Sequence, residues 1–269
     1  MTSELSNIEE IEEEVQGLLC EIIAFHKGKK RKIARRIKKT AHTNQDALAL
    51  KQFGLPLPAD YRALYRNHNG IKISNNLPED QTGIFFEFQW LEQHVLTNIN
   101  KVIRAEKLTP NVHRRLLVFP SFLLRALYLD FDLQDNDTVP LVVRSGSLAT
   151  NGYIAFDSVL AMLRSVHAAH QAGVIHYPGR AEPLNDADGG EAAAMGYQPK
   201  ELWDVIKTFN SRATYWSHLI EGDIDWKEID VSLPTDGVVR LSADVYEAVV
   251  GDRKQYLKDY PGDDTASDD

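Results

Sequence analysis

The stretch that decides the fold is LPLPADYRALYRNHNG, residues 55–70. Pro58 suits the first turn of a helix, because the N–H that proline lacks would have no intrahelical partner there. Gly70 stands where a helix commonly ends in a left-handed residue. Residues spaced three and four apart would form one face of this helix, namely Leu57, Tyr61, Leu64, Tyr65 and His68. The stretch therefore predicts a short helix that begins at Pro58 and buries Tyr61.

Helical spacing and strand alternation extend on both sides of this stretch. Before it, apolar residues predict a helix over residues 6–25, and a weaker helical pattern continues over residues 30–52. After it, the alternation in IFFEFQW predicts a half-buried strand over residues 84–90. Helical spacing returns over residues 91–104.

Four short strands are predicted next, at residues 116–119, 126–132, 139–144 and 153–156. Their connections are too short to hold crossover helices, so the sheet should be mainly antiparallel. Asp157 or Ser158 can cap a following helix that carries Val159, Leu163 and Val166.

The carboxyl-terminal part is expected to be helical. A helix should start near Lys200 and keep one register through Ile220, and another should start at Ser242. These patterns predict an α+β protein with a mainly antiparallel sheet packed by helices. The expected divisions are a helical extension (1–45), an α+β core (46–176), a linker (177–198), a helical region (199–262) and an acidic, disordered tail (263–269).

Charge is unevenly distributed along the 269 residues. The formal net charge is −9, yet residues 27–39 (KGKKRKIARRIKK) hold nine basic residues, so the remainder carries −18. Seven glutamates and no Lys or Arg precede Lys27. No apolar run approaches the length of a membrane span, the acidic start is unlike a signal peptide, and there is a single cysteine. We therefore expect a cytoplasmic protein.

The basic run has two interpretations. It could be a nucleic-acid patch or nuclear-import signal, or it could be the solvated face of a helix that carries Ile33 and Ile37 and attracts the acidic helix before it. No aromatic residue interleaves the run, which disfavours base stacking, and an acidic remainder would repel phosphate. The helical interpretation is therefore favoured, and nucleic-acid binding is the less favoured alternative.

Catalytic and metal-binding motifs are sparse in this sequence. GxSxG, GxxxxGK[ST], GxGxxG and HExxH are all absent. The cluster Asp130, Asp132, Asp135 and Asp137 could suggest calcium, but the glycine and final glutamate of an EF-hand loop are missing, which favours a hairpin turn. An enzyme would need a polar pocket with perturbed carboxylates, for instance around Asp130 and Asp132.

Isolated histidines and the cysteine carry little chemistry. His167 and His170, with His176 beyond, could share a metal but lack further ligands at recognisable spacing, so exposed or capping roles are expected. Cys20 falls in the apolar register of the first helix and should be buried. We predict no catalytic residue, no metal site and no cofactor.

The segment FGLPLPADYRALYRNHNGIKI resembles the opening motif of the SUKH superfamily of Smi/Knr-like proteins. The matching residues are Leu57, Pro58, Asp60, Tyr61, Leu64, Tyr65, Asn69 and Gly70. Trp90 with Leu91 is similar to the strand-to-helix position of the family, and LLVFPS, LYLDFD, VPLVVR and YIAFDSVLAMLRSV are similar to its later strands and final helix. The resemblance covers about residues 46–172 and departs from the family in lacking glycine before the central strands.

The resemblance implies an α+β binding domain without shared catalytic residues. Most bacterial members are similar to immunity proteins that neutralise a polymorphic toxin, often a nuclease, and eukaryotic members to signalling or cell-wall-regulating scaffolds. Nuclease toxins carry basic clefts for phosphate, and an acidic protein is steered onto such a cleft. We therefore expect a non-enzymatic immunity protein with a basic toxin as partner, and a Smi/Knr-type scaffold as the alternative.

The expected contacts to that partner are acidic residues on loops, because a rigid scaffold commonly displays its recognition groups there. Glu79 and Asp80 lie in the polar turn before the first strand, and Asp135 and Asp137 lie between central strands. The alternative is that these acids only solvate their turns, and the carboxyl-terminal helices could also carry the interface.

Overall fold

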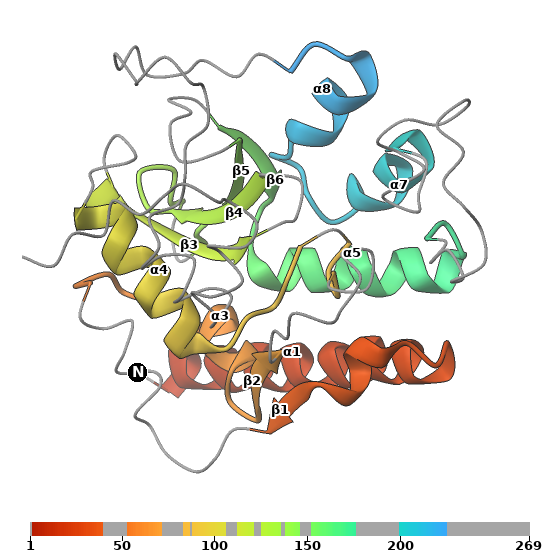
Figure 1. Cartoon of the computed structure of the whole chain (residues 1–269), viewed down its shortest axis with the longest axis horizontal. Helices are drawn as coiled ribbons and strands as arrows, with labels where there is room; N and C mark the ends of the chain where they lie inside the picture. The colour runs from red at the N-terminus through yellow and green to blue at the C-terminus, as the bar shows by residue number, and fades with distance from the viewer. Residues whose placement is uncertain are drawn as a thin grey trace, which may run out of the picture.

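The fold is an antiparallel sheet packed by helices, as the sequence predicts (Figure 1). A computed structural model describes residues 2–39, 53–71, 83–86, 88–105, 112–120, 125–135, 138–145, 152–175 and 199–224. The predicted linker 177–198, the helix from Ser242 and the acidic tail lie outside these residues.

The central sheet has four strands that follow one another in space as in sequence. They are β3 (Arg115–Pro120), β4 (Arg125–Asp130), β5 (Leu141–Ser145) and β6 (Tyr153–Phe156). Every neighbouring pair is antiparallel, with Leu127 opposite Val143 at the centre. The four strand predictions and the antiparallel arrangement are confirmed.

Helix α4 (Gln93–Ala105) packs on β3, one of the two outer strands of this sheet. The buried amide of Asn100 donates a hydrogen bond to the carbonyl of Leu117 (2.8 Å) and accepts one from the N–H of Leu117 (2.9 Å). Asn100 thus satisfies both backbone groups of one residue on an edge strand, where a neighbouring strand would otherwise be needed.

Helices α1 (Thr2–Gly28) and α5 (Val159–Ala172) lie side by side, and α1 also packs on α3 (Ala59–Leu64) (Figure 1). The predicted first helix is confirmed. Its buried side chains belong to the same hydrophobic core as the sheet, namely Val15, Leu19, Ile22 and Ile23. The domain boundary at residue 45 stays a prediction, but the helix before it shares the core.

Ion pairs fasten the flanks of α1. The Arg164 guanidinium of α5 donates two hydrogen bonds of 2.7 Å to the carboxylate of Glu14, and Arg66 pairs with Glu12. The imidazole of His167 on α5 contacts the Glu21 carboxylate. The acidic helix is therefore bonded to the core.

The helix predicted from residue 30 is wrong for residues 30–39, and its residues 40–52 lie outside the described part of the chain. Lys27 and Gly28 end α1, and the basic run continues as a 3₁₀ turn, η1 (Lys32–Arg35), and then β1 (Ile37–Lys39), which pairs antiparallel with β2 (His68–Ile71). The fully buried side chain of Ile33 anchors the segment in the core. The spacing of four between Ile33 and Ile37 imitates a helical period, although the chain between them is not an α-helix.

The predicted strand over residues 84–90 is also replaced by a different structure. Phe85 and Phe88 form one isolated bridge, and Phe86 has a φ of 58° that breaks any extended ladder. Phe85 is buried as well as Phe86 and Phe88, so both faces of the segment pack in the core and neither is a solvent-exposed face. The helix that follows is confirmed as α4, and a further 3₁₀ turn, η3 (Val112–Arg114), leads into β3.

The single helix expected from Lys200 through Ile220 is two helices. They are α7 (Pro199–Ile206) and α8 (Tyr215–Glu221). Asp157, just before α5, accepts hydrogen bonds from the N–H groups of Ser211 and Arg212, and the buried Asn210 side chain accepts one from the N–H of Asp157. These bonds hold the connection between α7 and α8 against the start of α5, which breaks the helical register.

Candidate partner-binding surface

The polar residues of the opening motif act within the fold. Asp60 is buried in α3. Its carboxylate accepts hydrogen bonds from the N–H of Tyr61 and from the N–H of Leu160 in the first turn of α5. Burial raises the pKa of Asp60, while the N–H donors and the Ser158 hydroxyl oppose that rise. Ser158 is itself the N-cap of α5 and accepts from Ala161 N–H, as predicted. Asp60 thus joins α3 to the start of α5.

Asn69 and Gly70 join β2 to the start of α4. Asn69 accepts a hydrogen bond from the N–H of Gln93, the first residue of α4. Gly70 has a φ of 73°, and a Cβ there would lie 2.3 Å from the carbonyl oxygen of Leu91. Gly70 therefore has the left-handed conformation expected, but it lies in β2 and does not end the helix, which stops at Leu64.

The apolar motif residues lie in the core. Tyr61, Leu64 and Trp90 are fully buried, Leu57 nearly so, and the hydroxyl of Tyr65 donates a hydrogen bond to the carbonyl of Leu91 (3.0 Å). Pro58 is the N-cap of α3, one position before the predicted one. The expected burial of Tyr61 is confirmed, whereas His68 leaves the helix face and enters β2.

One of the four predicted partner contacts can be placed. Asp135 is exposed in the turn between β4 and β5, where it forms a bridge with Thr138. Glu79, Asp80 and Asp137 lie outside the described residues. The candidate partner-binding surface is therefore the hairpin turn, residues 131–135.

The hairpin turn is braced from within. Asp130, at the end of β4, accepts a hydrogen bond from Asp132 N–H, and its carbonyl accepts one from Leu133 N–H. The Arg114 guanidinium pairs with Asp132 and also donates to the carbonyl of Phe131. These bonds fix the turn on the end of the sheet, as predicted for a hairpin.

The hairpin turn is also braced from the carboxyl-terminal helices. Arg212, between α7 and α8, donates a hydrogen bond of 2.7 Å to the carbonyl of Leu133. The side chain of Leu133 is 41% exposed, one of three large apolar side chains that are exposed among the described residues. Sequence reasoning missed Leu133 and Arg212. For Leu133, the available signal was an apolar residue inside the polar DLQDND turn. No local pattern predicts the role of Arg212.

Asp130 itself is structural. Its carboxylate is 1% exposed and accepts from Arg115 Nε at 2.9 Å and from Arg144 Nη2 at 3.5 Å. Burial lowers the pKa of Arg144, and the neighbouring Arg115 charge lowers it further. These two guanidinium groups come from β3 and β5, so the Asp130 carboxylate joins β4 to both neighbouring strands.

Two histidines pack where α1 meets α5. His26 is fully buried, and His170, expected to be exposed or capping, is 6% exposed with its ring stacked on Phe25 at 3.9 Å. Arg31 donates to Nδ1 of His26 at 3.0 Å, so the other ring nitrogen of a neutral His26 faces the carbonyl of Ile84. Burial, then the Arg31 charge and the neighbouring histidine, lower the pKa of His26 and of His170 to about 3.

Cys20 is exposed, so the expectation that it is buried is wrong. It lies on the outer face of α1, which also presents Glu9, Glu10 and Glu13. Cys20 follows the fully buried Leu19, and one residue turns a helical side chain by about 100 degrees.

The basic segment, residues 27–39, presents its cations to solvent. The exposed ones are Lys27, Lys29, Lys30, Arg35, Lys38 and Lys39. Arg31 is partly buried and donates to the carbonyl of Gly83. The segment is thus held to the fold by its buried residues, and its basic side chains form a solvent-exposed edge.

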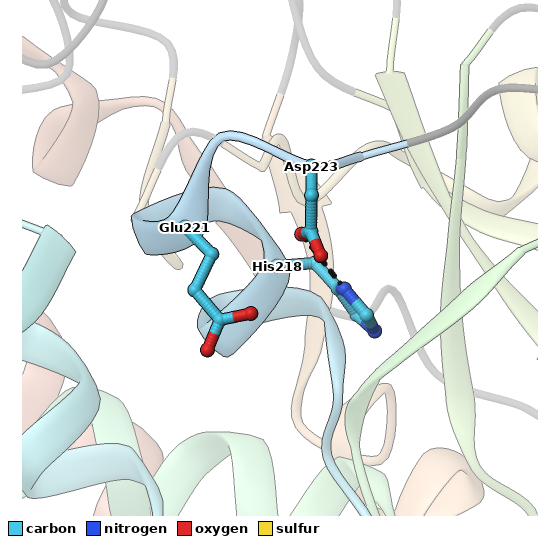
Figure 2. Close-up of side chains that lie close together, drawn as sticks. All are labelled: His218, Glu221 and Asp223. Atoms are coloured by element: carbon cyan, nitrogen blue, oxygen red, sulfur yellow. Dashed lines mark hydrogen bonds and ion pairs between the residues drawn. The ribbon is translucent and has the colours of Figure 1, made fainter.

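Among the described residues, one group brings three possible metal ligands together at the end of α8: His218, Glu221 and Asp223 (Figure 2). The described helices include none that is long and apolar enough to cross a membrane. Comparison of the sequence with protein-family models and with curated proteins finds no match.

Proposed function

We propose that this protein is a non-enzymatic immunity protein that binds and neutralises a basic toxin domain of the nuclease type. The single observation that supports it most is the hairpin turn, which offers an exposed apolar side chain, Leu133, between the carboxylates of Asp132 and Asp135. Recognition groups are commonly carried on loops held by a rigid scaffold, and this turn is braced from two sides.

The resemblance of the opening motif to SUKH proteins supports the same proposal. The motif residues described above cap helices, fill the core or allow close backbone approach, so they specify a fold and leave recognition to other parts of the surface. The charge of −18 outside the basic segment favours a cationic partner, because opposite charge accelerates association.

The test compares hairpin variants with matched variants elsewhere. Asp135→Lys should slow association with the toxin, and Leu133→Ala should speed dissociation, at a cost of about 1 to 2 kcal/mol. Glu201→Lys and Ile220→Ala alter an exposed acid and a similarly exposed apolar residue on α7 and α8, and both should bind as the parent does. The probe is the protein encoded by the neighbouring reading frame, in pull-down, kinetic binding and growth-rescue assays.

Two outcomes would count against this proposal. If the folded hairpin variants protect cells as well as the parent, the interface lies elsewhere. If the parent neither binds nor neutralises the neighbouring product, the immunity function is wrong, and a Smi/Knr-type scaffold becomes the preferred function.

A second candidate function, nucleic-acid binding, is favoured by one observation: the basic segment exposes six cations on an anchored edge. Binding of a fluorescent DNA duplex should then weaken with salt. Lys38→Gln with Lys39→Gln should lower the slope of log affinity against log salt by about 0.9 for each phosphate that the protein no longer neutralises. Retention that is independent of the two lysines would exclude them as phosphate contacts, and a parent that shows no salt-dependent retention would rule out nucleic-acid binding.

A further inference from the structure

The end of α8 brings an imidazole and two carboxylates together (Figure 2). His218 Nδ1 lies 2.9 Å from Asp223 Oδ1, and one donor atom from each of His218, Glu221 and Asp223 falls within 4.8 Å of the others. We propose that these three residues form a binding site for a divalent transition-metal ion, with Zn²⁺ as the reference ion.

The local backbone explains why these residues meet. His218 and Glu221 are three apart and therefore share one face of the helix. Gly222 ends α8 with a φ of 70°, and the N–H groups of Gly222 and Asp223 both donate to the carbonyl of His218. This reversal brings Asp223 back alongside the imidazole.

The imidazole is positioned by the sheet. Its ring centroid lies 4.8 Å from that of Tyr153 on β6, and about a third of the His218 side chain is exposed. Its Nδ1 faces Asp223, so a metal ion at that nitrogen would take the place of the shared proton. A ligand held by packing loses less freedom on binding than one that is fully mobile.

The donor distances fit a modest closure around an ion. Zinc is tetrahedral, with bonds of about 2.0 to 2.2 Å to imidazole nitrogen and carboxylate oxygen, so two donors on one ion lie about 3.3 to 3.6 Å apart. The present spread of 4.8 Å must therefore close by about 1 Å or slightly more. Glu221 is exposed and carries no ion pair within the part of the chain that the structure describes, so its side chain is able to rotate inward.

The chemistry of the donors selects the class of ion. One imidazole nitrogen with two carboxylates suits zinc and its neighbours, whereas calcium and magnesium prefer oxygen ligands alone. With a neutral imidazole the cluster carries two negative charges, which a dication balances. Three protein ligands leave a coordination position for water or for a donor from another molecule.

The experiment titrates the metal-free full-length chain with ZnCl₂ and, separately, MgCl₂ by calorimetry. Zinc should bind with a stoichiometry of one at this site, and magnesium should bind far more weakly. His218→Ala, Glu221→Gln and Asp223→Asn should each lower zinc affinity by about tenfold or more, since loss even of outer-shell partners costs that much. His94→Ala and Glu201→Gln alter exposed residues on α4 and α7 and should bind zinc as the parent does.

A second measurement separates binding from folding. Zinc should raise the melting temperature of the parent and of both controls, but not that of the three site variants. Glu221→Gln is the safest variant because its side chain is exposed. Zinc affinity that is unchanged in all three variants, equal binding of magnesium, or no saturable zinc binding by the folded parent would each overturn the proposal.

Discussion

At the scale of single residues, polar side chains in this protein connect elements that are distant in sequence. Asp60 reaches the first turn of α5, and Asn69 reaches the first turn of α4. The first N–H groups of a helix have no intrahelical partners, so an acceptor from another element both satisfies one of them and fixes the position of the helix. The motif residues therefore determine where α3 and β2 dock.

Replacement of Gly70 tests the closest backbone contact. Gly70→Ala should lower the free energy of unfolding by at least about 2 kcal/mol, for two reasons. An alanine is strained in the left-handed conformation, and its Cβ would lie 2.3 Å from the carbonyl oxygen of Leu91. Gly54→Ala is the matched control, since Gly54 has a φ of 70° with open space around its Cβ position. Equal losses in urea unfolding of the two variants would contradict the close approach.

Tyr61 tests the core side of the same motif. Its ring is fully buried and lies 5.3 Å from the Tyr65 ring and 6.5 Å from the Phe119 ring, so Tyr61→Ala should cost about 3 to 5 kcal/mol through reduced burial and a cavity. Arg62→Ala, at the next and exposed position, provides the comparison. Similar melting temperatures for the two variants would show that the helix presents a different face.

At the scale of elements, sequence periodicity predicted well where one face decides the structure. The four strands, α4 and α5 with its Ser158 cap were predictable because their apolar periods are local. The basic segment was mistaken for a helix because Ile33 and Ile37 are four apart, and its pairing with β2 is non-local. The break between α7 and α8 depends on bonds to Asp157, more than fifty residues away.

The candidate site was predictable in outline only. The hairpin turn and Asp135 follow from the strand pattern, whereas the brace from Arg212 to Leu133 spans 79 residues and has no local signal. His218 was not predicted because its partners, Glu221 and Asp223, follow it by three and five residues. Asp223 faces His218 only because the chain reverses at Gly222.

The contact between α1 and α5 should respond to pH through its buried histidines. The pKa values of His26 and His170 are about 3 in the folded protein and near 6.5 when unfolded, so the unfolded chain takes up protons first as pH falls. Their contribution to stability is therefore present above pH 6.5 and is lost progressively down to about pH 3. Between pH 7 and 5.5 each histidine should remove about 1 kcal/mol from the free energy of unfolding.

The measurement is urea unfolding of the parent and His170→Phe at these two pH values. The variant keeps an aromatic ring against Phe25, and its pH-dependent loss should be about 1 kcal/mol smaller than that of the parent. Asn98→Ala alters an exposed, non-ionisable residue on α4 and should leave the pH dependence unchanged. An identical pH dependence for the parent and His170→Phe would show that His170 protonates freely in the folded state.

At the scale of the whole molecule, charge and packing divide the surface into distinct regions. The outer face of α1 is acidic, the basic segment follows directly behind it, and the braced hairpin turn closes the end of the sheet beyond β4. The inner face of α1 meanwhile belongs to the common core, and its flanking glutamates bond to Arg66 and Arg164. A partner that docks on α1 therefore meets a helix that shares the hydrophobic core of the sheet.

Removal of α1 tests that unity. Val15, Leu19, Ile22 and Ile23 are all buried, and burial of each contributes about 1.5 to 3 kcal/mol, a sum comparable with the total stability of about 5 to 15 kcal/mol of an ordinary domain. A chain that lacks residues 2–28 should therefore lose cooperative thermal unfolding in circular dichroism. Leu19→Ala should cost about 2 to 5 kcal/mol in the full chain, whereas Glu9→Gln with Glu13→Gln should change stability by less than about 0.5 kcal/mol. A truncated chain that still melts cooperatively near the parent temperature would mean that the core from residue 46 onward folds without this helix.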